Sequence, residues 1–184
     1  LEVSTNPKII KKALRIKPDF ICIVPENRKE ITTEGGLDLR SNKNKLEKII
    51  QKFKKKKIRT SLFINPKLSD IKISNQLETD CIELHTGKLA NLIKTKKNFL
   101  NEFDRIKKCS LLADKLGLEV HAGHGLDYKT TKILTNIREK FEPLGEKKSK
   151  VPPYFYVNAT FGNEKLGQLL IQCEAKPIQI SYKI

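Results

Sequence analysis

The chain has 184 residues, of which 38% are hydrophobic, and its 37 Lys and Arg against 21 Asp and Glu give a formal net charge of +16. That length and apolar content suit one soluble domain with a buried core, and no apolar run approaches the ~20 residues that a membrane span needs. A charge excess of this size attracts nucleic acid, acidic membranes or phosphorylated small molecules, but it does not determine a fold.

Short apolar runs alternate with segments of helical periodicity along most of the chain. The run at 20–24 is too short for a helix and too continuous for a half-exposed strand, so it predicts a strand buried on both faces. The predicted strands cover residues 1–3, 20–24, 58–64, 81–85 and 118–122, and the predicted helices cover 7–16, 42–56, 67–75 and 98–116. This alternation predicts an α/β fold with a parallel sheet.

Several helix ends carry their own signals. Asn6 and Pro7 predict an N-cap and a first helical position, and Asn65 with Pro66 predicts the same for the helix at 67–75. Gly117 predicts the end of the longest helix. We expect the inner side of that helix to hold Phe99, Phe103, Ile106, Leu111, Leu112 and Leu116.

The cysteines and lysines indicate the surroundings of the protein. The four cysteines, Cys22, Cys81, Cys109 and Cys173, show no metal-like spacing, so we expect small buried thiols, no disulfide, no zinc and a reducing, cytoplasmic location. The lysine clusters fall mainly on predicted outer helices and are not interleaved with aromatic residues. They favour a solvated surface over an RNA-binding face, and nucleic acid is kept as the alternative.

Polar side chains gather where the predicted strands end. A loop rich in charge and hydroxyl groups, including Thr32, follows the strand at 20–24 and ends in Gly35 and Gly36. Glu2, Thr32, Glu83 and His124 all lie at or just beyond the ends of successive strands, so a barrel would bring them to one mouth. Two of them have a simpler interpretation: His124 as a turn residue between glycines, and Glu83 as a salt-bridged core carboxylate. His85 and His121 are interpreted as structural.

Three motifs carry a resemblance to a known family. The stretch V-P-E-N-R-K-E-I-T-T-E-G-G-L-D, with C-I-E-L-H-T-G and H-A-G-H-G-L after it, resembles pyridoxine 5′-phosphate synthase from residue 1 to about residue 137. The first of these motifs is by far the most specific. The resemblance implies a TIM-type (β/α)₈ barrel, here partial, with the chain beginning in the family's third strand and reaching its seventh.

The resemblance also implies a reaction and the residues that perform it. The family condenses 1-deoxy-D-xylulose 5-phosphate with 3-amino-2-oxopropyl phosphate, releasing phosphate and water, needs no metal or redox cofactor, and assembles into homo-octamers. By position, Glu2 would be a proton acceptor, Thr32 would bind the deoxyxylulose phosphate, and Glu83 would stabilise charge in the transition state. His124 would be a proton donor, and Gly125 would contact the aminooxopropyl phosphate.

The resemblance does not extend over the whole chain. We divide it into a partial barrel at 1–140 and a divergent basic tail at 141–184, in which 154–159 and 177–184 have the pattern of strands and 163–173 that of a short helix. About two βα units of the family are unmatched at the front, so we expect an incomplete form that is inactive in isolation. The alternative is a non-catalytic, nucleic-acid-binding protein on a barrel-derived scaffold. An aldolase is disfavoured because no strand-end lysine is placed for a Schiff base.

Overall fold

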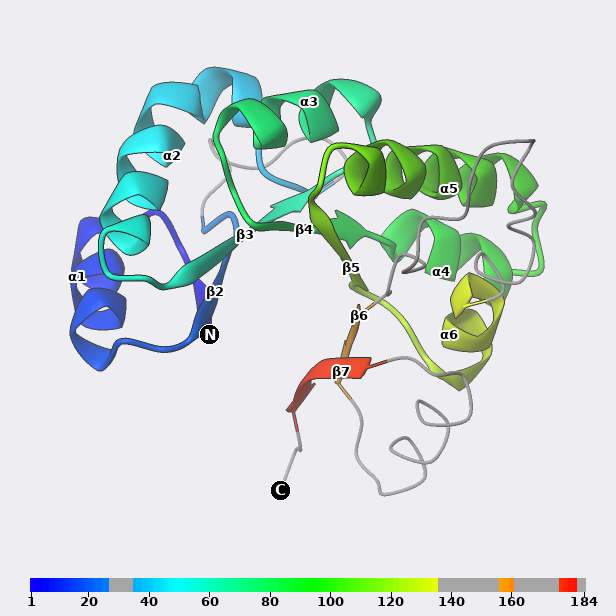
Figure 1. Cartoon of the computed structure of the whole chain (residues 1–184). Helices are drawn as coiled ribbons and strands as arrows, with labels where there is room; N and C mark the ends of the chain where they lie inside the picture. Colours follow the sequence, from blue (N-terminus) through cyan, green and yellow to red (C-terminus); the bar gives the residue numbers. More distant parts are fainter. Residues whose placement is uncertain (27–34, 136–155, 161–175, 182–184) are drawn as a thin grey trace.

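A computed structural model describes residues 1–26, 35–135, 156–160 and 176–181, the last two ranges as backbone only. Strands and helices alternate along the chain (Figure 1). The strands are β1 (Glu2–Val3), β2 (Phe20–Ile23), β3 (Arg59–Ile64), β4 (Cys81–His85), β5 (Glu119–Gly123), β6 (Tyr156–Thr160) and β7 (Lys176–Ser181). The helices are α1 (Pro7–Ile16), α2 (Leu39–Lys54), α3 (Leu68–Gln76), α4 (Gly87–Lys94), α5 (Leu100–Lys115) and α6 (Tyr128–Thr135).

The described strands form one sheet in the order of the chain, from β1 to β7, and every neighbouring pair is parallel. This confirms the predicted α/β fold and parallel sheet. The strand-like patterns at 154–159 and 177–184 correspond to β6 and β7, and β7 lies at the edge of the sheet. The helix expected at 163–173 lies outside the described residues.

The register divides the sheet into two faces. Cys22, Ser61, Cys81 and Glu119 lie side by side on adjacent strands, and because side chains alternate along a strand, Glu83 and His121 share their face. We call this the inner face. The outer face carries fully buried apolar side chains, and helices α1 to α5 lie along that outer side of the curved sheet (Figure 1).

The core lies between the outer face and the helices. Its side chains, each no more than 1% exposed, include Ile21, Ile23, Leu46, Ile50, Phe53, Leu62, Ile64, Ile82 and Leu84. Burying one such aliphatic or aromatic side chain contributes roughly 1.5–3 kcal/mol, so this layer stabilises the sheet and fixes the position of its inner face.

Local signals set several helix ends as predicted. Asn6 Oδ1 accepts a hydrogen bond from the Lys8 N–H at 2.9 Å, with Pro7 at the first helical position. Gly117 has φ +78° just after α5, a backbone conformation that glycine adopts without strain. Asp38 caps α2 by accepting from the Ser41 N–H at 3.2 Å, so this helix begins three residues before its predicted start.

Two expectations about helices were wrong, and two helices were not predicted. Asn65 is not an N-cap, because α3 begins after Lys67, which makes no side-chain capping bond. Leu111 and Leu116 are 37% and 36% exposed, not on the inner side of α5. Helices α4 and α6 were not predicted; both have only eight residues, too few for periodicity to separate a helix from a loop.

Candidate functional site

The carboxyl ends of three strands bring three aromatic rings together. His85 is the last residue of β4, and His124 follows the last residue of β5. Their ring centroids lie 4.6 Å apart with an interplanar angle of 25°, which is a stacked arrangement. The Phe63 ring of β3 lies 5.2 Å from the His85 ring and 6.3 Å from the His124 ring. This ring cluster (Phe63, His85 and His124) lies at the edge of the sheet where parallel α/β folds hold their ligands.

Two glycines allow the backbone to approach the ring cluster closely. A Cβ atom at Gly35 would lie 2.8 Å from His85 Nε2, and one at Gly87 would lie 2.7 Å from His85 Cε1 and 2.8 Å from His124 Cδ2. Such distances are shorter than real Cβ contacts, so any side chain at either position would displace an imidazole. Gly35 also has φ +103°, a conformation that favours glycine. The Gly-Gly turn and the Thr-Gly turn of the motifs thus pack against the same histidine.

The Gly-Gly turn is attached to the end of β3. The Gly36 N–H donates to Asn65 Oδ1 at 3.0 Å, and the Leu37 N–H donates to the Phe63 carbonyl at 2.9 Å. The Asn65 side chain is fully buried and holds this turn in place, and it does not cap a helix. Thr32, the residue of the preceding loop expected to bind the deoxyxylulose phosphate substrate, lies outside the described residues.

The backbone that carries His124 is held in an unusual conformation. His124 has φ +81° and Gly125 has φ +74°. For a residue with a side chain, this left-handed conformation costs on the order of 1 kcal/mol. Thr86 Oγ1 donates to the Gly123 carbonyl at 2.6 Å and lies 2.9 Å from the His124 carbonyl oxygen, and Lys94 Nζ donates to the Gly125 carbonyl at 2.7 Å. An exposed imidazole is therefore presented from a fixed turn.

A buried carboxylate lies deeper on the inner face. Glu83, two residues before His85, is 5% exposed, and Cys22 Sγ donates to its Oε2 at 3.5 Å. Burial, followed by the nearby Glu83 carboxylate, raises the pKa of the Cys22 thiol well above its usual value, so this group stays protonated. Glu2 lies opposite Cys22 in the register of β1 and β2, and it is exposed. Two carboxylates therefore flank one protonated thiol.

The described part of the structure connects most of the predicted site residues. Glu2 adjoins Cys22, Cys22 contacts Glu83, and His85 lies two residues beyond Glu83 on the same face of β4 and stacks on His124. His85 was interpreted as structural, yet its ring stacks on the exposed imidazole of His124, and it lies on the same face of β4 as Glu83. Its spacing of two from Glu83 and the Thr-Gly turn after it were the sequence signals for that position.

The order and spacing of these residues match a known family. The sequence pattern described as "Pyridoxal phosphate biosynthesis protein PdxJ" matches residues 1–143. The chain belongs to the PdxJ family. Relatives of this family include the pyridoxine 5′-phosphate synthase of Pelagibacter ubique, 63% identical over 139 residues, which are 76% of this chain and 58% of that protein. Another is the pyridoxine 5′-phosphate synthase of Hydrogenobaculum sp., 40% identical over 147 residues, or 78% of this chain and 61% of that protein.

The chain spans about three fifths of the length of these curated PdxJ relatives, 58% and 61% respectively. A solved structure of a xylose isomerase domain protein from Planctomyces limnophilus has a similar fold, with a TM-score of 0.56 over 96% of this chain and 70% of that chain, at 9% identity. That similarity concerns the fold alone and agrees with the barrel architecture implied by the PdxJ family.

These matches do not favour the nucleic-acid-binding alternative. Among the described residues, no helix is both long and apolar enough to cross a membrane. Cys22, Cys81 and Cys109 are buried, as predicted, and Cys173 lies outside the described residues.

Proposed function

We propose that this chain carries catalytic residues of a pyridoxine 5′-phosphate synthase, which condenses 1-deoxy-D-xylulose 5-phosphate with 3-amino-2-oxopropyl phosphate. The relatives above bear that name. The motifs that carry the resemblance contain Glu83 and His124, and Glu2 lies before them in β1. In this proposal Glu2 accepts a proton, His124 donates one, and Glu83 stabilises charge in the transition state. Residues 1–140 form the barrel part and 141–184 a divergent segment; homo-octameric assembly and a cytoplasmic location belong to the same proposal.

One observation carries the proposal: the buried carboxylate of Glu83 lies on the same face of β4 as His85, whose ring stacks on the exposed imidazole of His124 at the end of β5. Closing a pyridine ring from two carbonyl compounds requires Schiff-base formation and loss of water, and each step moves protons and creates positive charge on nitrogen. A carboxylate such as Glu83, withdrawn from water, stabilises such charge more strongly than a solvated one does. Imidazole is the side chain most often used for general acid–base catalysis, and the His124 side chain is exposed where a substrate can reach it.

The remaining residues would bind the phosphorylated substrates. Thr32 is proposed for the deoxyxylulose phosphate, and Gly125, whose carbonyl is held by Lys94, for the aminooxopropyl phosphate. Because Gly125 follows His124 directly, that substrate would lie beside the proton donor. The basic character of the chain, with a net charge of +16, favours attraction of two anionic substrates.

A chimera tests this proposal. Residues 1–143 of this chain would replace the matching segment of the Pelagibacter ubique synthase, which supplies the rest of a full-length protein. We expect the folded chimera to form pyridoxine 5′-phosphate from both substrates, measured by chromatography. A chimera that is folded and octameric but makes no product would contradict the proposal.

Two variants of the chimera test whether His124 is the proton donor. His124→Ala is expected to lower kcat by roughly 10²–10⁴-fold, the usual contribution of a general acid. Lys129→Ala, an exposed position five residues further on, is the matched control and is expected to leave kcat unchanged. Equal activity of the two variants would exclude His124 as the donor.

A further inference from the structure

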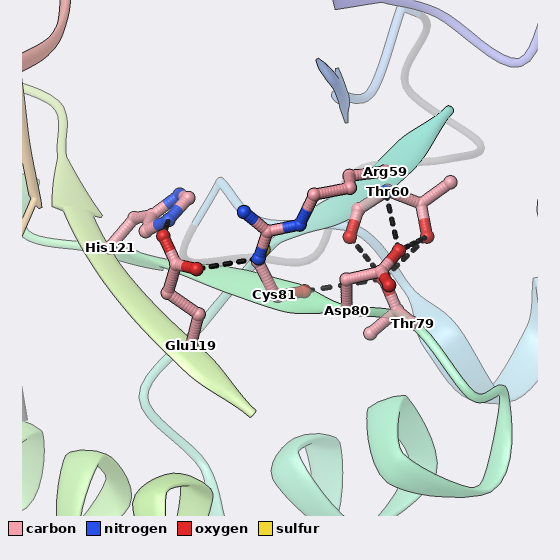
Figure 2. A network of polar contacts seen from close by, with 7 residues as sticks. All are labelled: Arg59, Thr60, Thr79, Asp80, Cys81, Glu119 and His121. Carbon is pink, nitrogen blue, oxygen red and sulfur yellow. Dashed lines mark hydrogen bonds and ion pairs between the residues drawn. The ribbon is translucent and has the colours of Figure 1, made fainter. Parts of the chain in front are cut away.

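A second group of reactive side chains lies on the inner face, away from the ring cluster. Cys81 begins β4, and Glu119 lies directly opposite it at the start of β5. His121 is two residues further along β5 and therefore projects from the same face. Cys81 Sγ, a Glu119 carboxylate oxygen and a His121 ring nitrogen all lie within 4.8 Å of one another. Figure 2 shows these three side chains converging with Arg59 of β3.

The ligand types in this group are specific. Thiolate sulfur, imidazole nitrogen and carboxylate oxygen together suit Zn²⁺ or Co²⁺, whereas Mg²⁺ and Ca²⁺ prefer oxygen ligands alone. Cys81 is fully buried and His121 is 1% exposed, so two of the three ligands are already shielded from water and fixed by the sheet. The Glu119 side chain is 27% exposed and leaves a route to solvent. A site of three protein ligands with one open position is a common arrangement for these metals.

A cation already lies against two of the three ligands. Arg59 Nη2 donates to Glu119 Oε2 at 2.5 Å and to Cys81 Sγ at 3.3 Å, while His121 Nε2 and Glu119 Oε1 are 3.0 Å apart. The Arg59 side chain is 50% exposed, so it can turn out into solvent without disturbing the core.

We propose that Cys81, Glu119 and His121 form a binding site for a Zn²⁺-like divalent cation, which competes with the Arg59 guanidinium for the same ligands. Binding breaks the S–H bond of Cys81, forms a metal–sulfur bond and releases one proton to solvent. Arg59 leaves Glu119, and the imidazole of His121 exchanges its hydrogen bond to Glu119 for a metal–nitrogen bond, with its proton on Nδ1. Because the ligands come from two strands, spacing along the sequence could not reveal them.

Cobalt is the probe for the test, because a Co²⁺–thiolate bond gives a charge-transfer absorption band in the near ultraviolet. Tag-free chain would be titrated with Co²⁺, and we expect a saturable band at one equivalent that Zn²⁺ abolishes. Cys81→Ser is expected to lose the band. Cys109→Ser is the matched control: it removes another buried free thiol, whose pKa is raised by burial to about 12, and should keep the band.

Competition with Arg59 gives a second readout that a purely structural ion pair would not produce. Arg59→Gln removes the competing guanidinium and is expected to lower the Kd for Co²⁺ by roughly two- to fivefold. That factor corresponds to the interaction free energy of a half-exposed ion pair. Circular dichroism would confirm that each variant folds. The proposal is overturned if the wild-type chain gives no saturable band, whatever the result for Arg59→Gln. It is also overturned if the band persists in Cys81→Ser or disappears in Cys109→Ser.

Discussion

The inner face of the sheet holds histidines in two contrasting environments. At the carboxyl ends of the strands, His124 is exposed and its ring stacks on His85 beside glycines. Toward the amino ends, His121 is 1% exposed and paired with Glu119, which is paired in turn with Arg59. The same residue type is thus available to a ligand at one end and enclosed by partners at the other. The candidate active site is therefore distinguished by the exposure and backbone conformation of its histidine, and not by the residue type.

After His124→Ala, the largest expected effect concerns the buried Glu83 carboxylate on the inner face. Glu83→Gln in the chimera keeps the shape of the side chain and an oxygen for the Cys22 thiol, but removes the negative charge. We expect kcat to fall by about 10²–10³-fold, as when one electrostatic group is removed from a preorganised site. The free energy of unfolding, from urea titration, should change by less than about 1 kcal/mol. A loss of activity matched by an equal loss of stability would make Glu83 a structural residue.

A substitution beside the rings tests the importance of their position. In Gly87→Ala the new Cβ would overlap both His85 and His124, so the imidazoles must move. A displacement of this kind is expected to lower kcat/KM by up to about 10²-fold. Gly117→Ala is the comparison: a Cβ there meets nothing within 4 Å, and the φ of +78° at Gly117 makes that substitution strain the backbone, whereas Gly87 has no positive φ. If both variants lose activity equally, general destabilisation rather than displacement of the rings is the cause.

Substitutions near the amino ends of the strands are expected to change the stability of the fold and not the activity. Asp80 Oδ2 accepts from the Thr60 N–H at 2.7 Å and from Thr60 Oγ1 at 3.2 Å, in the network of Figure 2. Asp80→Ala leaves these buried donors without that acceptor and should lower the free energy of unfolding by roughly 1–3 kcal/mol. Product formation by the corresponding folded chimera should stay unchanged. A specific loss of kcat would show that the two ends are coupled.

The smallest expected effect concerns Asp38, which lies near the carboxyl ends of the strands but serves as a helix cap. Asp38 caps α2, and the hydrogen bonds from the side chain and backbone of Ser41 lower its pKa from 3.8. Asp38→Ala should cost about 1 kcal/mol at neutral pH. Because the pKa is lower in the folded state, this stabilisation is complete above pH 3.8 and is lost as the pH falls further. Urea titrations of both proteins should therefore converge in acid, and a difference independent of pH would contradict the role of the charge.

Much of the fold could be predicted because its signals are local. The buried run at 20–24 and the cap at Asn6 lie within single segments, and the structure has β2 and α1 there. Asn65 shows where local rules fail. Its position before Pro66 suits a helix cap, but its side chain accepts a hydrogen bond from the N–H of Gly36, 29 residues away in the sequence. Helix α4 was missed because eight residues hold too few turns for a periodic pattern.

The sequence by itself determined the α/β class, the order of the elements and membership in the PdxJ family, because hydrophobic periodicity, caps and motifs are written in consecutive residues. Only the tertiary structure decided which side chains meet. The contact of Cys22 with Glu83 spans 61 residues, and the stacking of His85 on His124 depends on the register of β4 against β5. Register is set by packing of the whole outer face on its helices, so no single segment contains it.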